Sequence, residues 1–465
     1  MEARSLKFVA DACEAELSHG EAGSLVKNVC TDSRQAKPGD LFFAIKGEKF
    51  NGHDFLNEVA AKGVAAIVIE KSKVQSPKSK TAPGAALLAV DDTRIALGKL
   101  AAAYRKDFAL PVVCVGGSNG KTTVKELIAS TLRQKLATLW SEASFNNDIG
   151  VPLTLLRMEK SHQAAVLEAG TNHPGELAPL VKMIQPKFGL LTNIGREHLE
   201  YFGDIAGVAR EEGRLAEVLP ANGKLFLNVD NEWSEQIAAR TKAKVILVGL
   251  AEKSDWRAEK IRLDKNGATF RVQAFREEFC GEYRINLLGR HQVTNALFAT
   301  AVGEELGLGR AEIQRGLAEC RPAKMRLQFW ETNGVHILDD TYNANEDSMI
   351  AALETLCDLP LQGRRVAVLG DMKELGTHSV AAHAEVGRRA AGLGIGQLFA
   401  VGKMAPVMAK AARAAGLARV IEFADVEAAT NAVKNFLKTG DVVLLKASRA
   451  AGLERIVEVL KSGKA

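Results

Sequence analysis

A short glycine-rich segment, CVGGSNGKTT at residues 114–123, carries the residue types of a phosphate-binding loop. The usual pattern places four residues between a first glycine and Gly-Lys-Thr, but here Val115 stands where that glycine would be. The Lys121 ammonium can neutralise the β- and γ-phosphates of a nucleotide, and the Thr122 hydroxyl can ligate Mg²⁺. The segment therefore predicts a triphosphate site formed by Gly116, Gly117, Ser118, Asn119, Gly120, Lys121, Thr122 and Thr123.

The sequence on either side of this loop predicts its place in the fold. PVVCVGG (111–117) has the continuous apolar character of a buried strand, and TTVKELIASTLRQKL (122–136) has that of a helix. A helix N-terminus presents free N–H groups and the positive end of the helix dipole, which favour phosphate. The alternative is a glycine-rich turn without a ligand. Gly-Lys-Thr-Thr between a strand and a helix favours nucleotide binding.

The segment GGSNGKTT is similar to the phosphate loop of the Mur ligase superfamily, whose members use ATP to join amino acids or peptides to a carboxylate. The loop alone does not separate these enzymes from folylpolyglutamate synthase. Three further segments resemble, in order, the signatures of the branch that adds D-Ala-D-Ala to UDP-MurNAc-tripeptide: DDTYNANEDSM (339–349), VLGDMKELG (368–376) and LLKASRAAGLE (444–454). Composition alone would make the first of these an Asn/Asp-rich turn.

The resemblance implies contacts with ATP and with the reacting groups. Asp340 would contact the ribose, Asn295 in LLGRHQVTNALFATAVGEELG (287–307) the adenine, and Arg326 in CRPAKMRLQFW the phosphates. Asn295 and Arg326 could instead be helix or linker residues without such roles. The signature segments place further residues near the substrates, namely Tyr342, Asn343, Asn345, Lys446, Ser448 and Arg449.

Two other regions resemble the substrate-binding segments of the family. TDSRQAKPGDLFFAIKGEKFNGHDF (31–55) would surround the uridine nucleotide-sugar, although it could also be an ordinary surface loop. EASFNNDIGVPLTLL (142–156) and EAGTNHPGE (168–176) would contact the muramoyl peptide, and Asp148 could simply cap a helix. The residues implied are Ser33, Arg34, Lys46, Gly52, His53, Asn146, Asn147, Thr171, Asn172 and His173.

The resemblance also implies a magnesium site. Glu168 ends a predicted strand, which is a usual place for an active-site carboxylate in an α/β sheet. By itself His198 would more often be a hydrogen-bonded structural histidine, but EHLEYFG (197–203) resembles the histidine motif of the family. Glu168, His198 and Thr122 are therefore assigned to Mg²⁺.

One position departs from the family pattern. Many Mur ligases carry a carbamate-modified lysine on the helix after the histidine, whereas GVAREEGRLAEVL (207–219) has Glu212 at that place. Glu212 could supply a carboxylate directly, so our hypothesis is that no carbamate forms there. The alternative is that Glu211 and Glu212 are solvated helix charges.

The elements that must position these residues form a repeated pattern of short apolar strands and helices. The pattern predicts parallel α/β sheets with helices on both faces, and the C-terminal part resembles a doubly wound Rossmann-like fold without its G-x-G-x-x-G fingerprint. The length of 465 residues suggests about three domains. We expect a smaller UDP-sugar-binding domain (1–91), an ATP-binding domain (92–320) and a Rossmann-like domain (321–465), with ATP between the second and third.

The individual elements follow from the same pattern. We expect helices at 54–61, 93–106, 122–136, 381–392 and 406–416, and a loop at 74–86. Strands are expected at 41–45, 65–69, 86–90, 111–117, 164–170, 188–195, 223–230, 243–249, 334–338, 365–371, 397–402, 418–423 and 441–448.

Composition narrows the class of protein. Apolar residues make up 47% and charged residues 25% of the chain, and the net charge of +5 suits an anionic small-molecule substrate. No Lys/Arg run points to nucleic acid, and no apolar stretch of about 18 residues predicts a membrane span. The N-terminus lacks a signal-peptide pattern, and the six cysteines are scattered without a C-x-x-C pair. These features predict a cytoplasmic protein with reduced thiols, and we expect a monomer.

The resemblance implies a ligase that converts UDP-MurNAc-tripeptide, D-Ala-D-Ala and ATP into UDP-MurNAc-pentapeptide, ADP and phosphate, a step of peptidoglycan precursor synthesis. Two alternatives remain open. One is a ligase of the same superfamily with a different amine substrate. The other is a regulatory protein that keeps the nucleotide-binding fold without catalysis.

Overall fold

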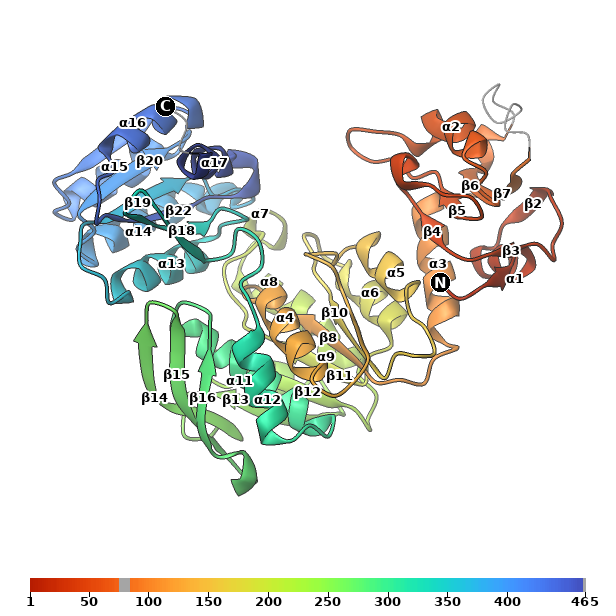
Figure 1. Cartoon of the computed structure of the whole chain (residues 1–465), viewed down its shortest axis with the longest axis horizontal. Helices are drawn as coiled ribbons and strands as arrows, with labels where there is room; N and C mark the ends of the chain where they lie inside the picture. The colour runs from red at the N-terminus through yellow and green to blue at the C-terminus, as the bar shows by residue number, and fades with distance from the viewer. Residues whose placement is uncertain (75–83, 463–465) are drawn as a thin grey trace. The chain divides into compact units, whose positions relative to one another are not determined.

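The computed structural model describes residues 1–74 and 84–462, and its chain path is shown in Figure 1. The protein is of the α/β class, as predicted, and its described strands form four sheets of two, five, six and nine strands. The chain divides into two compact units. One comprises Met1–Cys114, Leu136–Thr171 and Leu177–Phe188, and the other Val115–Lys135, Asn172–Glu176 and Gly189–Ala465.

The N-terminal part of the first unit is built on the five-stranded sheet. Strands β4, β5, β6 and β7 pair in parallel, and β2 joins β7 in the antiparallel direction. The strands are β2 (Glu16–His19), β4 (Val29–Cys30), β5 (Leu41–Phe43), β6 (Ala66–Glu70) and β7 (Ala86–Val90). The remaining elements are β1 (Arg4–Ser5), β3 (Leu25–Val26), α1 (Leu6–Cys13), α2 (Leu56–Ala61) and the 3₁₀ turns Ser33–Gln35, Gly52–Phe55 and Lys71–Lys73.

These elements confirm the strands expected here. The expected helix 54–61 is divided between a 3₁₀ turn and α2, and the expected loop 74–86 falls largely outside the described residues. Phe42, Ile67 and Val59 are buried in the core that α2 forms with the sheet.

The nine-stranded sheet has the order β16-β15-β14-β13-β12-β11-β8-β10-β9. Its strands are β8 (Val112–Gly116), β9 (Thr138–Trp140), β10 (Ala164–Glu168), β11 (Phe188–Leu191), β12 (Lys224–Asn228), β13 (Lys244–Gly249), β14 (Trp256–Asp264), β15 (Gly267–Ala274) and β16 (Gly281–Ile285). The helices between and after them are α3 (Thr93–Arg105), α4 (Lys121–Leu132), α5 (Gly150–Leu155), α6 (Leu177–Ile184), α7 (Leu199–Phe202), α8 (Ile205–Glu212), α9 (Arg214–Val218), α10 (Ser234–Ala238), α11 (His291–Glu305) and α12 (Arg310–Glu319).

The nine-stranded sheet is rich in parallel pairs, as predicted, but one of its edges is antiparallel. Strands β14, β15 and β16 pair in the antiparallel direction, although β13 and β14 pair in parallel. In β15, buried Ala268, Phe270 and Val272 alternate with more exposed residues. A half-buried strand has this alternation and lacks the continuous apolar run that marked the other strands.

The six-stranded sheet has the order β17-β18-β22-β19-β20-β21, and only β17 is antiparallel to its neighbour. Its strands are β17 (Gln328–Thr332), β18 (Val335–Asp340), β19 (Arg365–Gly370), β20 (Gln397–Val401), β21 (Val420–Phe423) and β22 (Val442–Lys446). The helices are α13 (Glu346–Asp358), α14 (Ser379–Gly392), α15 (Ala405–Ala414), α16 (Val426–Phe436) and α17 (Glu454–Ser462), with 3₁₀ turns at Gly376–His378 and Arg449–Ala451.

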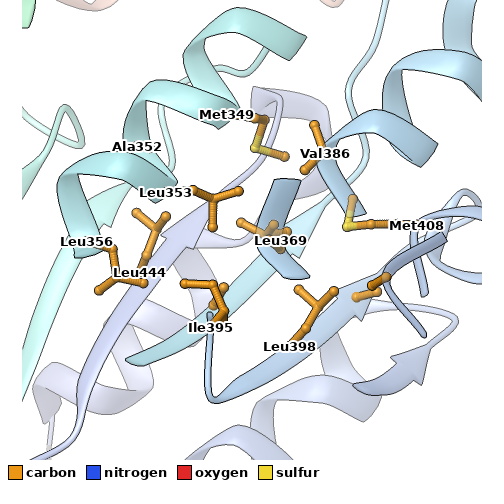
Figure 2. Close-up of a cluster of buried hydrophobic side chains, with 14 of the residues drawn as sticks. Met349, Ala352, Leu353, Leu356, Leu369, Val386, Ile395, Leu398, Met408 and Leu444 are labelled. Carbon is orange, nitrogen blue, oxygen red and sulfur yellow. The ribbon is translucent and has the colours of Figure 1, made fainter. Parts of the chain in front are cut away.

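Both faces of this sheet carry a hydrophobic core, as the doubly wound prediction required. Along β19, Ala367 and Leu369 face α13, α14 and α15, and this core is drawn in Figure 2. Val366 and Val368 alternate with them and pack with residues of α16 and α17 on the other face. The helices on both faces leave the carboxyl ends of the strands to carry functional side chains.

Candidate active site

The glycine-rich loop lies between the end of β8 and the start of α4, as predicted. Gly117 and Gly120 have φ angles of +104° and +87°, in the region that favours glycine. A Cβ atom at Gly117 would lie 2.5 Å from the Oγ1 atom of Thr192. The loop conformation therefore requires glycine at these two positions.

The segment that follows β11 holds the loop in place. The Ser118 N–H donates to the carbonyl of Asn193 (2.8 Å), and the Asn119 N–H donates to Asn193 Oδ1 (3.2 Å). The Asn193 side-chain amide donates to the Asn119 carbonyl (3.0 Å), and the Gly195 N–H donates to Ser118 Oγ (2.8 Å). Sequence reasoning missed Asn193 because its role depends on a contact between distant segments.

The Lys121 ammonium group lies against the loop. Its Nζ donates to the carbonyls of Gly117 (2.5 Å) and Ser118 (3.3 Å) and lies 3.3 Å from Glu197 Oε2. Glu197 is buried, and its Oε1 atom has no hydrogen-bond partner among the residues that the structure describes. Glu197 was also missed, although it directly precedes His198 in the histidine motif.

Glu212 is fully buried, which excludes the interpretation that it is a solvated helix charge. Its Oε2 atom accepts the Gly117 N–H at 2.6 Å, whereas Oε1 has no hydrogen-bond partner within residues 1–74 and 84–462. Burial raises the pKa of Glu212 to about 7, against an opposing effect of the Lys121 charge. The neighbouring Glu211 is buried too and accepts the Gly175 N–H at 3.0 Å.

His198 contacts a carboxylate from a distant part of the chain. Its Nδ1 atom lies 2.5 Å from Glu374 Oε2, and its Nε2 atom lies 3.9 Å from Glu197 Oε2. The hydrogen bond to His198 lowers the pKa of Glu374. Both residues have left-handed backbones, with φ angles of +48° for His198 and +60° for Glu374. Sequence reasoning missed Glu374, which lies inside one of the signature segments.

The signature residues of the C-terminal region lie together at the ends of β18 and β22. Lys446 Nζ lies 2.5 Å from Asp340 Oδ2 and donates to the Asn343 carbonyl at 2.9 Å. Ser448 Oγ donates to the Ala344 carbonyl (3.1 Å) and accepts the Lys373 N–H (2.9 Å). Lys446 and Ser448 thus fix the segment that carries Asn343 and Asn345.

The linker before β17 brings Arg326 to the same region. The Arg326 guanidinium lies 4.2 Å from the centre of the Tyr342 ring, and the Leu327 N–H donates to Asp340 Oδ1 (3.1 Å). Arg449 is largely exposed, lies 3.5 Å from Glu454 and contacts the Met325 sulfur atom.

Polar contacts connect the phosphate loop region with these C-terminal segments. The Asn345 side-chain amide donates to Asn119 Oδ1 at 2.9 Å. Asp347 accepts both the backbone N–H of Arg196 (2.7 Å) and its guanidinium (2.5 Å). Asn295 also lies beside the loop, since a Cβ atom at Gly120 would lie 3.1 Å from Asn295 Oδ1. The structure therefore brings the loop together with Asn295 and with the first signature segment.

Glu168 lies at the end of β10 in the first unit and is buried. Its Oε1 atom accepts a hydrogen bond from the Asn146 side chain (2.8 Å), and Oε2 has no partner in the described parts of the chain. The Oδ1 atom of Asn147 accepts the N–H groups of Ile149 (3.2 Å) and Gly150 (2.9 Å) at the start of α5, whose N-cap residue is Ile149. The alternative that Asp148 is the helix cap was wrong, and Asp148 instead pairs with Arg94 (3.3 Å).

The segment after Glu168 contributes the remaining peptide-site candidates. Thr171 is buried, whereas Asn172 and His173 are exposed. Glu176 Oε2 accepts the N–H groups of Asn172 (2.8 Å) and His173 (3.1 Å). The His173 ring lies 4.1 Å from the Tyr201 ring. Tyr201 was not singled out in the sequence.

The predicted uridine-nucleotide segment folds around η2, the Gly52–Phe55 turn. Gly52 needs the absence of a side chain, because a Cβ atom would lie 2.7 Å from the Ile45 backbone nitrogen. His53 is buried: Nε2 accepts the Glu70 N–H (3.1 Å), and Nδ1 lies 2.9 Å from Asn51 Oδ1. Both ring nitrogens of His53 are therefore used within the fold.

The other residues of that segment differ in exposure. Lys46 is exposed and pairs with Asn51 in an isolated antiparallel bridge. Arg34 is 84% exposed and forms an ion pair with Asp32 at 2.7 Å. Ser33 is buried, and its carbonyl accepts a hydrogen bond from Lys62 (2.7 Å).

The residues that the structure describes contain neither a cluster of metal ligands nor a helix that could span a membrane. No three His, Cys, Asp or Glu side chains there are grouped closely enough to hold a metal ion by themselves. None of the helices described is long and apolar enough to cross a membrane.

Three family descriptions match the chain in succession. They are "Mur ligase family, catalytic domain" at residues 25–105, "Mur ligase middle domain" at residues 115–303 and "Mur ligase, glutamate ligase domain" at residues 325–449. Together they cover most of the chain.

Similarity to named proteins agrees with these family matches. The chain is 39% identical to the UDP-N-acetylmuramoyl-tripeptide–D-alanyl-D-alanine ligase of Escherichia coli K12, over 82% of this chain and 83% of that enzyme. It is 32% identical to the enzyme of the same name from Bacillus subtilis 168, over 95% and 94%.

Solved structures agree with these relatives. The fold superposes on MurF from Acinetobacter baumannii with a TM-score of 0.89, at 32% identity and 99% coverage of both chains. It superposes on MurF from Thermotoga maritima in complex with ADP with a TM-score of 0.80, at 27% identity and with 94% and 97% coverage. The chain belongs to the Mur ligase family.

Proposed function

We propose that the protein is an ATP-dependent ligase that joins D-Ala-D-Ala to UDP-MurNAc-tripeptide and releases ADP and phosphate. The observation that carries this proposal is the contact between Asn119 of the phosphate loop and Asn345 of the first signature segment. This contact joins the phosphate loop, which would bind ATP, to a segment that resembles a signature of the D-Ala-D-Ala-adding branch of the family. The product, UDP-MurNAc-pentapeptide, is a precursor of peptidoglycan.

The chemistry explains why ATP is needed. A carboxylate is a poor electrophile, so the terminal carboxylate of the tripeptide first attacks the γ-phosphorus and releases ADP. The acyl phosphate formed has a good leaving group. The dipeptide amine then attacks the carbonyl carbon, the C–N bond forms, the amine loses a proton, and the C–O bond to phosphate breaks. Lys121, at the phosphate loop, would stabilise the charge that develops during phosphoryl transfer.

Mg²⁺ fits the donors present. A magnesium ion prefers oxygen ligands, and the buried Oε2 of Glu168 has no hydrogen-bond partner in the part of the chain that the structure describes. We assign the ion to Glu168, Thr122 and His198, held directly or through water. The ion would neutralise phosphate charge, as it does in other phosphoryl-transfer enzymes.

Glu212 takes the place of the modified lysine in our proposal. A carbamate would need a lysine nitrogen, and Glu212 already has a buried carboxylate that accepts the Gly117 N–H. Its role would be to hold the phosphate loop while it contributes a carboxylate to the site. The helix α8 has the sequence IAGVAREE and contains no lysine, so no carbamate can form on it.

The other candidate residues divide by ligand. Asn295, Arg326 and Asp340 would contact ATP. The UDP site would be formed by the segment that contains Ser33, Arg34, Lys46, Gly52 and His53. His53 would support the shape of this site without contacting UDP through its ring nitrogens, because both bond within the fold. The peptide substrates would meet Asn146, Asn147, Thr171, Asn172, His173, Tyr342, Asn343, Asn345, Lys446, Ser448 and Arg449.

The residues proposed to bind the substrates belong to both compact units. We therefore expect the chain to become more compact when substrates bind. Small-angle scattering with an ATP analogue and both substrates would measure this change, and an unchanged radius of gyration would contradict it. We propose that the enzyme acts as a monomer in the cytoplasm, where ATP and UDP-linked precursors are available.

Phosphate release from ATP and Mg²⁺ tests the function directly. We expect release only when UDP-MurNAc-tripeptide and D-Ala-D-Ala are both present, together with a product of pentapeptide mass. The Lys121→Ala variant should lose this activity, whereas Lys410→Ala, at an exposed position on α15, should keep it. Release with a different amine would keep the family and change the substrate. No release with any combination would indicate a nucleotide-binding protein without catalysis.

A further inference from the structure

The contact between His198 and Glu374 joins segments that are 176 residues apart in the sequence. His198 follows β11 of the nine-stranded sheet, and Glu374 follows β19 of the six-stranded sheet. The His198 side chain is 15% exposed and that of Glu374 is 38% exposed, so the pair lies at the edge of the protein interior. Neighbouring residues of the two segments are also in contact, so the pair does not depend on its own side chains alone.

A backbone hydrogen bond and a side-chain contact fix the two segments against each other. The Glu200 N–H donates to the Glu374 carbonyl at 3.0 Å, and His378 Nε2 lies 2.9 Å from the Gly203 carbonyl. His198 and Glu374 both have left-handed backbones, a conformation that costs a residue other than glycine about 1 kcal/mol or more. Strained residues of this kind persist where the surrounding contacts hold them, and they gather at functional sites.

The chemistry of the pair determines the state of the imidazole. An ionised carboxylate only accepts hydrogen bonds, so the short contact to Glu374 requires the proton on Nδ1 of His198. The lone pair of neutral His198 is then on Nε2. That atom lies 3.9 Å from Glu197 Oε2, which itself lies 3.3 Å from Lys121 Nζ. The ring nitrogen that can accept a proton or bind a ligand is therefore the one on the side of Glu197, the carboxylate that pairs with the phosphate-loop lysine.

We infer that Glu374 is a positioning residue that holds His198 as its Nδ1–H tautomer, with Nε2 directed to the nucleotide site. A carboxylate that accepts the second N–H of a ligating histidine has this effect at metal sites generally. Because Glu374 comes from the segment after β19, His198 is set correctly only while that segment contacts α7. The inference rests on the proposed function for the role of His198, but the tautomer is a property of the protein alone.

Three variants test the assignment. Glu374→Ala removes the acceptor, and Glu374→Gln keeps an oxygen that can accept the Nδ1 proton but removes the charge. Glu200→Ala is the matched control, because Glu200 is an exposed carboxylate two residues after His198 whose backbone, rather than its side chain, contacts Glu374. Circular dichroism and thermal unfolding would establish that each variant is folded.

The first measurement is the tautomer of His198 in protein labelled with ¹⁵N in its histidine rings, with His198→Gln used to assign the resonances. We expect Nδ1–H in the wild type, in Glu200→Ala and in Glu374→Gln, and a change to Nε2–H in Glu374→Ala. An Nε2–H tautomer in the wild type would overturn the inference. So would an Nδ1–H tautomer that persists in Glu374→Ala.

The second measurement is binding of Mg²⁺ in the presence of ADP, compared with ADP binding in EDTA. Glu374→Ala should weaken Mg²⁺ binding about 10- to 100-fold, the range found when such supporting carboxylates are removed. ADP binding in EDTA should not change. Glu374→Gln should lose less affinity for Mg²⁺ than Glu374→Ala. An equal loss of Mg²⁺ affinity in Glu200→Ala would contradict a specific role of Glu374. If the wild type bound no nucleotide, the proposed function would fail, and the tautomer result would still decide the inference.

Discussion

The ammonium group of Lys446 lies 2.5 Å from the carboxylate of Asp340, where parallel strands β18 and β22 place the two residues opposite each other. The Lys446 side chain is 3% exposed and that of Asp340 is 14% exposed. Removing one partner of a buried ion pair leaves an uncompensated charge in the interior, which is strongly destabilising. The pair therefore stabilises the C-terminal sheet at the position where the signature segments meet.

Lys446→Met is expected to destabilise the six-stranded sheet by on the order of 3 kcal/mol. Hydrogen–deuterium exchange of β18 and β22 peptides would measure the loss locally, because a chain with several sheets does not unfold in one step. Lys410→Met, at an exposed position on α15, is the control and should leave exchange unchanged. Equal protection in the two variants would show that the pair contributes no stability.

Glu212 gives the protein a predictable dependence of stability on pH. Burial raises the folded-state pKa of this carboxyl to about 7, above its ordinary value of 4.5, so the folded state retains a proton that the unfolded state releases. The contribution to stability is therefore full below the ordinary value and is lost as the pH rises toward 7. Glu212→Gln cannot ionise, so its thermal stability should exceed that of the wild type by a margin that grows between pH 5 and pH 8.

At pH 8 the difference for Glu212→Gln should approach about 3 kcal/mol, since one unit of pKa corresponds to about 1.4 kcal/mol. The side-chain amide oxygen of this variant can still accept the Gly117 N–H, so the loop contact is preserved. A variant at an exposed glutamate, Glu235→Gln on α10, serves as the control and should show no such trend. A difference that is the same at all pH values would mean that Glu212 titrates normally.

Asn345 has two separable tasks. Its Oδ1 accepts the Ser348 N–H and caps α13, and its Nδ2 donates to Asn119 in the phosphate loop. Asn345→Asp keeps the cap but replaces the donor with a carboxylate opposite Asn119 Oδ1. We expect this variant to retain the thermal stability of the wild type and to raise KM for ATP about tenfold, which corresponds to about 1.4 kcal/mol.

Asn345→Ala completes this comparison. It loses the helix cap as well, which should cost about 1 kcal/mol of stability in addition to the increase in KM. Steady-state kinetics and thermal unfolding separate the two effects. An unchanged KM in Asn345→Asp would show that the contact between the loop and the signature segment does not contribute to ATP binding.

His53 is expected to act through the fold of the five-stranded sheet. His53→Ala would leave the Glu70 N–H and the Asn51 side chain without their buried partner, at a cost of roughly 1 to 3 kcal/mol. Exchange of β6 peptides should therefore increase, and KM for UDP-MurNAc-tripeptide should rise while ADP binding stays constant. His19→Ala, at an exposed position of β2, is the control.

Acid should have a similar local effect at His53. Burial lowers its folded-state pKa, so the folded state favours the neutral ring, and stability is lost as the pH falls and the unfolded state takes up a proton. Exchange of β6 peptides that did not differ between the wild type and His53→Ala would contradict the structural role.

Features that depend on a contiguous sequence could be predicted from the sequence. The phosphate loop was identified because Gly117, Gly120 and Lys121 act through their own positions on one strand–loop–helix unit. The alternation of strands and helices in the C-terminal region was likewise sufficient to predict a doubly wound sheet, because its central strands β19, β20 and β22 are buried on both faces.

Features that depend on contacts between distant segments could not be predicted. The contacts of Asn193, Glu197 and Glu374 are not visible in the sequence, although the last two lie within motifs. Only the fold brings these residues to the loop, to Lys121 and to His198. The burial of Glu212 could not be predicted either, because two adjacent glutamates on a helix are typical of a solvated face. The antiparallel edge of the nine-stranded sheet was not predicted, because β15 alternates between buried and exposed residues.

The six-stranded sheet is covered on both faces by helices of the same chain segment, so apart from Leu288 its two cores are formed by that segment. Its links to the phosphate loop are instead a few polar contacts, such as those of Asn345 and Asp347. A module with this construction can be exchanged as a cassette. A chimaera that receives residues 325–465 from a relative should fold readily, and its catalytic competence should depend on whether the donor retains the few polar residues that match the recipient loop.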